Sequence, residues 1–348
     1  MQATLPPSMY LIRSEADRTG QESPGRVLTI LAIANQTIGV IGPVLGGLLI
    51  DLGGWQSTFL VNIPLSIACI ILGYIRFPKI AASLPEQEKK RVSIDFMGIA
   101  FFAFTLISLL LFLMNPSWHA IYLLIMAAVM GFFFVILELK IKEPFIDLRV
   151  LGSNTSLLLT YSRGILSALI SYSFIYSFPQ WLEQGRGLTP SHAGLLLLPM
   201  FLGAMIVSKL TGKSPAIRMK LIVGSLVQLI AISLLLFIRP SSSLYFLGLI
   251  VLLLGVPQGL LNLAIQNAVY FQAVREQIGA SAGLLRTFMY MGAILASCSN
   301  GLFLKDEATA VGIHHISVFC ICAGLLLITI TLMDRSLIKV GRNRLSES

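Results

Sequence analysis

Arginine and serine side chains form a polar stripe inside an otherwise apolar stretch of this sequence. Arg163 falls nine residues after Asn154, which is about 14 Å along a helix that rises 1.5 Å per residue. A charge so far inside an apolar helix normally faces protein or water. We interpret the stripe as the lining of a central cavity in which Arg163 helps to set substrate charge; the alternative is that Arg163 extends to the membrane surface. The stripe consists of residues three or four apart, which share one face of a helix: Thr160, Arg163, Ser167 and Ser171, followed by Phe174.

A row of amides gives a second candidate lining. Gln258, Asn262 and Gln266 lie four residues apart, just after Gly255 and Pro257, so they share one helix face. Amides in an apolar environment need hydrogen-bond partners. Water or a substrate in a cavity would supply them, and so would neighbouring helices, at about 0.6–2 kcal/mol per contact. Both interpretations stay open.

The remaining polar groups indicate no reaction chemistry. Adjacent residues do not share a helix face, so His314 and His315 make a poor metal site. Arg286 lies a turn or two inside its apolar stretch, where extension to the membrane surface is the better interpretation, and Asn35 is a candidate for a cavity or a helix interface. The four cysteines lie in apolar stretches and are expected to be buried thiols. With no nucleotide-binding glycine loop and no nucleophile elbow, we expect no enzyme, cofactor or metal.

The composition is that of a membrane protein. Of the 348 residues, 56% are apolar and 12% are charged, whereas soluble domains carry about 25% charged residues. The mean hydropathy is +0.85. The net charge of +9 does not indicate nucleic-acid binding, because the Lys and Arg residues occupy short loops between apolar stretches. A lipid bilayer is therefore the expected surrounding.

About ten apolar stretches are long enough to cross a bilayer, which takes roughly 20 residues per helix. Of the 25 Lys and Arg residues, 20 lie in the loops of one side and 3 in those of the other. This asymmetry predicts cytoplasmic termini, in a bacterial-type inner membrane. Continuous apolar runs favour helices over a barrel, so we predict an all-α polytopic fold with spans near 27–50, 55–76, 95–114, 119–138, 154–178, 191–211, 219–238, 243–270, 281–304 and 314–333.

A glycine-rich stretch early in the chain is suited to close helix packing. Gly42 and Gly46 are four residues apart and share a face, which Gly39 and Gly47 widen. Small residues let helix backbones approach closely in lipid, and Pro43 bends the helix at that point. We expect this helix to lie against a second helix and to flex there; the alternative is an ordinary packing groove of a polytopic protein.

The motif Gly-Pro-x-x-Gly-Gly at 42–47 is followed by DLGGW at 51–55 and FLVNIPL at 59–65. Together they resemble the antiporter motif and the next helix of the major facilitator superfamily, and they look closest to its fourteen-helix drug:proton antiporters of the EmrB/QacA type. In that family the motif lies on the fifth helix, where the two halves of the transporter meet. One residue departs from the pattern, because Ile38 stands where the family usually has glycine.

The resemblance implies a helical bundle of the superfamily type that lacks counterparts of the first four family helices. We also predict that the motif helix packs on the span 191–211, at a small-residue face formed by Gly194, Pro199, Gly203 and Ala204. The implied segments are a cytoplasmic N-terminal segment 1–26, the last two helices of the N-terminal bundle 27–76, a cytoplasmic linker 77–94, a central hairpin 95–138, a cytoplasmic connector 139–153, the six-helix C-terminal bundle 154–333 and a cytoplasmic tail 334–348.

The function that the resemblance implies is export of small amphipathic, often cationic compounds by proton antiport. The family's proton-linked residues belong to its first four helices, and no Asp or Glu lies at mid-membrane in this sequence. Two alternatives stay open. One is a non-transporting remnant or split-gene product of such a carrier, and the other is an exporter of a metabolite or siderophore.

Overall fold

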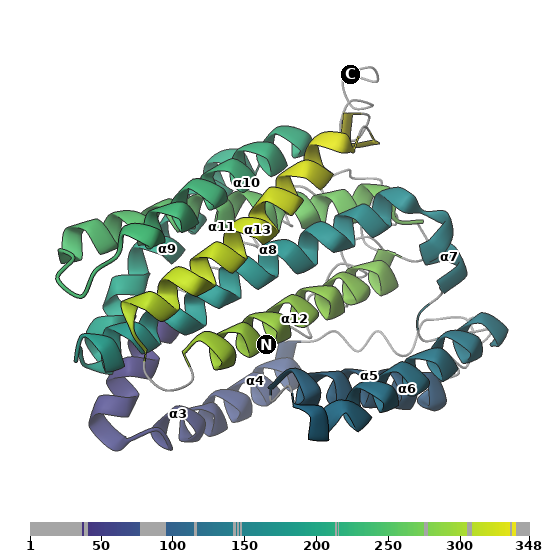
Figure 1. The fold of residues 1–348 in the computed structure, drawn as a ribbon, viewed down its shortest axis with the longest axis horizontal. Helices are drawn as coiled ribbons and strands as arrows, with labels where there is room; N and C mark the ends of the chain where they lie inside the picture. Colours follow the sequence, from purple (N-terminus) through teal and green to yellow (C-terminus); the bar gives the residue numbers. More distant parts are fainter. Residues whose placement is uncertain are drawn as a thin grey trace.

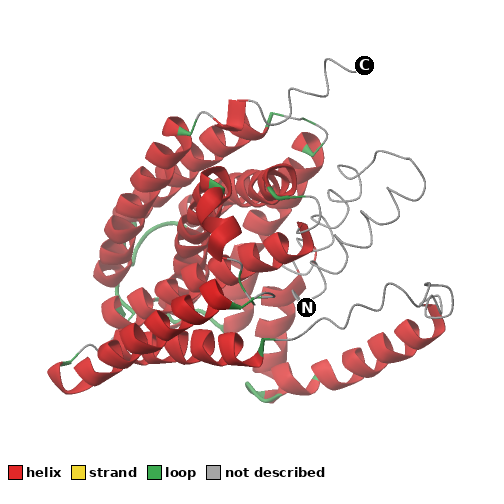
Figure 2. Cartoon of the chain, turned by 90° about the vertical axis from the view of Figure 1, so that its right-hand side faces the viewer, coloured by secondary structure: helices red, strands yellow, loops and turns green. Residues whose placement is uncertain are grey.

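The computed structural model of this chain describes residues 37, 41–76, 95–114, 117–141, 144, 146, 148–212, 214, 216–274, 278–304, 308–334 and 336–338. Over these residues the regular structure is helical throughout, without a strand (Figure 2). Nine of the described helices are long and apolar enough to cross a membrane, and they match nine of the ten predicted spans. The first predicted span, 27–50, is described mainly from residue 41 onward, as the helix Ile41–Gly53.

The helices follow one another with short connections. The longer ones are α4 (Asn62–Arg76), α5 (Phe96–Met114), α6 (Ile121–Lys140), α8 (Thr155–Gln180), α9 (Pro190–Thr211), α10 (Ile217–Leu234), α11 (Leu244–Gln272), α12 (Ile278–Phe303) and α13 (Ala310–Met333). The short ones are α3 (Ser57–Leu60), α7 (Leu148–Ser153), the 3₁₀ turns η4 (Trp118–Ala120), η6 (Leu235–Phe237) and η8 (Ser336–Ile338), and the π-helical turn η5 (Trp181–Gly185).

Helices α8 to α13 form one packed bundle, in which α8 and α13 run side by side through the centre of the view (Figure 1). Its core is apolar and continuous, from Leu157 at one end of α8 to Trp181 at the other. Four of the six helices begin at a polar N-cap whose side chain accepts a backbone N–H, which satisfies one of the free donors at a helix start. These caps are Asn154, Thr189, Ser243 and Thr309.

Glycines bring the helix backbones together in two seams of the bundle. A Cβ built on Gly259 of α11 would lie 2.6 Å from the Ala204 carbonyl oxygen of α9. In the same way, a Cβ on Gly292 of α12 would lie 2.9 Å from the Leu169 backbone nitrogen of α8. Both distances are too short for a side chain, so only glycine permits these approaches, which is the usual basis of helix association in lipid.

The N-terminal helices pack less extensively. Helices α5 and α6 form a hairpin beside α12 (Figure 1), held partly by the ring contact of Phe102 with Phe134 at 5.4 Å. The span that contains α4 has no buried residue in its most apolar window. The hairpin was expected at 95–138, and the linker expected at 77–94 lies outside the described residues.

Candidate functional site

The helix Ile41–Gly53 touches the bundle at the beginning of α9. A Cβ built on Gly47 would lie 2.6 Å from the Pro190 carbonyl oxygen and 2.9 Å from the Ser191 Cα. Pro43 lies one turn before Gly47, and a Cβ built on Gly194 of α9 would lie 2.9 Å from the Pro43 carbonyl carbon. The two backbones are thus in direct contact, and glycine is required on both sides of it. This contact joins the glycine-rich helix to α9, the helix that was expected to receive it.

The contacting face differs from the one expected. Among the described residues, nothing lies within 4 Å of a Cβ built on Gly42 or Gly46, so these two glycines do not form the close approach. Pro43 and Gly47 form it instead. They are also four residues apart, so they share a helix face, which lies one residue further around the helix than the face of Gly42 and Gly46. Spacing alone could not distinguish the two faces. Gly39 and Asn35 lie outside the described residues.

Asp51 extends this contact by one more turn. It follows Gly47 by four residues and accepts a hydrogen bond from the Ser191 hydroxyl. Since Thr189 caps α9 and Pro190 opens it, the carboxylate lies at the positive end of the helix dipole, where a negative charge is favoured. Asp51 was not among the residues predicted from the sequence, although it lies four residues after Gly47, on the same helix face as Pro43 and Gly47. Contact residues Pro43, Gly47 and Asp51 are called the gate face below.

The rest of the small-residue face expected on 191–211 has another partner. Gly203 and Ala204 face α11 rather than the helix Ile41–Gly53, since a Cβ on Gly203 would lie 3.6 Å from the Gly255 Cα. A Cβ on Gly255 would lie 3.2 Å from the Ala204 nitrogen. The predicted pairing therefore holds at Gly194 only, and the second half of α9 packs inside its own bundle.

Arg163 is neutralised inside the bundle. Its guanidinium is 0% exposed and forms an ion pair with Asp334, the residue that directly follows α13. It also donates to the Thr160 hydroxyl at 3.2 Å and to the Ile330 carbonyl at 3.4 Å. This geometry differs from both expectations for Arg163, the open cavity and the membrane surface. The sequence indicated its depth but not its direction, and Asp334 lies too far along the chain to be paired with it by spacing.

Asp334 is an ionisable group outside the membrane-spanning segments. Burial acts to raise its pKa, but hydrogen bonds from Ser336 and Arg163 and the positive charge of Arg163 outweigh that effect. The pKa of Asp334 therefore lies below its ordinary value, and the carboxylate is ionised at neutral pH.

The polar stripe around Arg163 faces other helices of the bundle. The Thr160 hydroxyl donates to the Gln272 side-chain oxygen at 2.6 Å, which joins α8 to the end of α11. Ser167 is buried, and Ser171 accepts a hydrogen bond from the Gln228 amide of α10 at 3.4 Å. The stripe thus connects α8 to three neighbours, and its serines are not displayed in an open space.

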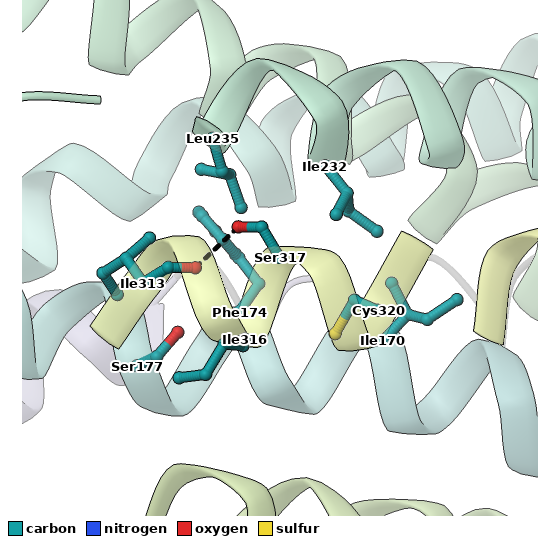
Figure 3. A pocket seen from close by; sticks show the side chains of 9 residues that line it. All are labelled: Ile170, Phe174, Ser177, Ile232, Leu235, Ile313, Ile316, Ser317 and Cys320. Carbon is teal, nitrogen blue, oxygen red and sulfur yellow. Dashed lines mark hydrogen bonds between the residues drawn. The ribbon is translucent and has the colours of Figure 1, made fainter. Parts of the chain in front are cut away.

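Phe174 lines a small internal pocket between α8, α10 and α13 (Figure 3). It stacks on Phe178 at 4.8 Å between ring centroids and shares the pocket with Ser177 and Cys320. Its cavity volume is about 10 Å³, enough for about one water molecule. Sites for drug-sized ligands measure about 300–1,000 Å³, so this pocket is no substrate site.

The amide row of α11 keeps the arrangement that its spacing predicted. Gln258, Asn262 and Gln266 are all half-buried, and the Gln266 amide donates to the Asn262 side-chain oxygen at 2.6 Å. Two members of the row thus satisfy each other along the helix. The half-buried face leaves their remaining donors and acceptors free to meet water or a ligand, and the cavity role of this row stays a prediction.

A sequence profile of the Major Facilitator Superfamily matches residues 3–297 of the chain. The chain belongs to the major facilitator superfamily. Its members are transporters, which agrees with the all-helical membrane fold. That fold class, expected from the sequence, is confirmed.

Individual members of the superfamily resemble most of the chain. The uncharacterized MFS-type transporter YwoD of Bacillus subtilis (strain 168) is 31% identical over 338 residues, 92% of this chain and 71% of YwoD. The riboflavin transporter RibZ of Clostridioides difficile (strain 630) is 26% identical over 275 residues, 77% of this chain and 58% of RibZ. The methylenomycin A resistance protein of Bacillus subtilis (strain 168) is 23% identical over 319 residues, 88% of this chain and 66% of that protein. The chain thus spans 58–71% of the length of these relatives.

Two further observations concern polar side chains in the described part of the chain. Within the described residues, no group of three His, Cys, Asp or Glu side chains could hold a metal ion. Arg286 of α12, expected to extend to the membrane surface, is instead 8% exposed. No role was predicted for Arg286, because the sequence gives its position along the helix but not the direction in which its side chain points.

Proposed function

We propose that this chain works in the export of small amphipathic compounds by alternating access, in the manner of the EmrB/QacA-type drug:proton antiporters. The observation that carries the proposal is the contact of the gate face with α9. Helices that meet backbone to backbone through glycine have no interdigitated side chains, so they can rock against each other with little repacking. Alternating access in such folds is a rocking of one bundle against another around a central site.

The domain assignment belongs to the same proposal. Residues 27–76 would be the last two helices of a first bundle, 95–138 a central hairpin and 154–333 the second bundle. The charge asymmetry of the loops supports cytoplasmic termini in a cytoplasmic membrane. Proton coupling is proposed from the family resemblance alone.

The experiment is an efflux assay in cells that express the chain at matched levels. Gly47→Ala places a methyl group 2.6 Å from a carbonyl oxygen and is expected to reduce export of a dye or antibiotic at least tenfold. Gly46→Ala is the matched control, because its methyl group meets nothing within 4 Å among the described residues, and it should export like the wild type. Equal export by both variants would remove the support for the proposal.

Two other functions are favoured by particular observations. RibZ, by its name a riboflavin transporter, favours a metabolite as substrate, and a competition assay with riboflavin and with antibiotics separates the two classes. The exposed length of α4 favours a chain that transports only together with further helices. Absence of efflux by the chain expressed alone, with correct membrane insertion, would favour that alternative.

A further inference from the structure

The bundle holds two arginines at the same level in neighbouring helices. Arg163 is the ninth residue of α8 and Arg286 the ninth residue of α12. The two helices run parallel, since Gly164 meets Leu285 and, further along both helices, Leu169 meets Gly292. Both side chains therefore lie about 12 Å from the helix starts, inside the membrane part of the protein.

The two arginines differ in their partners. Arg163 forms a buried ion pair with Asp334. Arg286 is 8% exposed yet has no ion pair or hydrogen bond with the residues that the structure describes. Tyr290 follows it by four residues on the same face of α12, and Tyr290 and Tyr172 both act on its charge. A charge held inside the membrane without a counter-ion is a functional-site candidate. Arg163 is thus a structural residue, and Arg286 has the property expected of a binding residue.

The surroundings of Arg286 suit an amphipathic anion. Tyr290 is 46% exposed and Tyr176 is 40% exposed, and the ring of Tyr176 lies 5.6 Å from that of Tyr172. Tyrosine offers a hydroxyl donor and an apolar ring in one side chain. A guanidinium forms paired hydrogen bonds with planar or tetrahedral oxyanions. Together these groups provide a charge, hydrogen-bond donors and aromatic surface.

We propose that Arg286 binds the anionic group of an amphipathic substrate, a carboxylate, sulfonate or phosphate, with Tyr290 one helical turn away on α12 as a second donor. The inference rests on the proposed export function and changes its substrate class, since the family resemblance implies cations. The carboxylate of Asp334 reaches the level of the two arginines, but it is already paired with Arg163 and is not available to attract a cation.

The test compares two dyes that share a xanthene ring system and differ in charge. Carboxyfluorescein is anionic and rhodamine 6G is cationic, and binding of each to the purified chain in phosphatidylcholine nanodiscs is followed by fluorescence polarisation. The wild type is expected to bind carboxyfluorescein more tightly. Arg286→Ala should weaken carboxyfluorescein binding about tenfold or more, since charge-assisted hydrogen bonds are lost, and should leave rhodamine 6G binding unchanged.

Arg239→Ala is the matched control, because it removes one positive charge from an exposed loop position and should bind both dyes like the wild type. Equal weakening of both dyes by Arg286→Ala, or tighter binding of rhodamine 6G by the wild type, overturns the proposal. The comparison of the two dyes on the wild type needs no variant, so the proposal can still be tested if the Arg286→Ala protein does not fold.

A lipid headgroup is the other source of the same anionic chemistry. Nanodiscs that contain phosphatidylglycerol should leave carboxyfluorescein binding unchanged; loss of binding there would assign Arg286 to lipid and overturn the substrate proposal. Measuring export as well as binding tests the anion site and the transport proposal separately. Binding through Arg286 without export of either dye keeps the anion site and refutes the transport proposal. Carboxyfluorescein export that is unaffected by Arg286→Ala refutes the anion site and keeps the transport proposal.

Discussion

Arg163 and Asp334 form an ion pair that closes the bundle on itself, because α8 opens the bundle and Asp334 directly follows its last helix, α13. The two side chains are 0% and 3% exposed. A pair so buried is costly to break from one side, since the remaining charge keeps its burial and loses its partner. A single substitution in this pair is therefore expected to destabilise the folded bundle.

Arg163→Gln and Asp334→Asn should each lower the free energy of unfolding by about 3–5 kcal/mol, the usual cost of breaking a buried pair. The measurement is reversible unfolding of the purified protein in mixed micelles. Arg239→Gln, at an exposed loop position, is the control and should change the free energy by less than about 0.5 kcal/mol. A loss at Arg163 no larger than the control would contradict a structural role for the pair.

The same pair predicts how stability depends on pH. The pKa of Asp334 is lower in the folded chain than its ordinary value of 3.8. Its contribution is therefore complete above pH 3.8 and is lost as the pH falls from there through the lower folded-state value. The difference in unfolding free energy between the wild type and Asp334→Asn should be constant near neutrality and shrink in that acidic range. A difference that grows with acidification would reverse the sign and disprove the assignment.

The gate face predicts a specific cross-link. The Asp51 and Ser191 side chains point at each other, so Asp51→Cys with Ser191→Cys, in a chain without the four native cysteines, should form a disulfide under mild oxidation. A covalent link across two helices that are proposed to rock against each other should stop export, and reduction should restore it. Ile50→Cys with Ser191→Cys is the control pair, because Ile50 is exposed on another face. Equal cross-linking of both pairs would mean that the contact is not specific.

Sequence reasoning reached the fold because membrane helices follow from apolar length alone. The nine spans described by the structure all coincide with predicted stretches. It did not reach the direction of individual side chains. Gly46 and Gly47 are neighbours in sequence, yet of these two glycines only Gly47 meets α9 within the described residues. The spacing of residues along a helix does not show which of two adjacent faces makes the contact.

The arginines show the same limit in electrostatic terms. Depth is a count along one helix, and Arg163 has its expected depth as the ninth residue of α8. Arg286 lies deeper than expected, because α12 begins at Ile278, three residues before the predicted span. The partner of a charge depends on helices distant in sequence, such as α13 for Arg163. Arg163, expected to line a cavity or reach the membrane surface, is paired with Asp334, and Arg286, expected at the membrane surface, is 8% exposed.

The amide row of α11 predicts a pattern of chemical accessibility. Asn262 is half-buried and bonded to Gln266, whereas its neighbour Leu261 is 1% exposed and packs in the core. If the row lines a water-filled path, Asn262→Cys should react with a charged methanethiosulfonate reagent in intact membranes, and Leu261→Cys should not. Substrate added first should slow the reaction at Asn262. Because a charged reagent does not enter lipid, labelling reports water at that face; a thiol at position 262 that stays unlabelled from both sides of the membrane would show that the amides serve helix packing and leave this superfamily member without its proposed polar path.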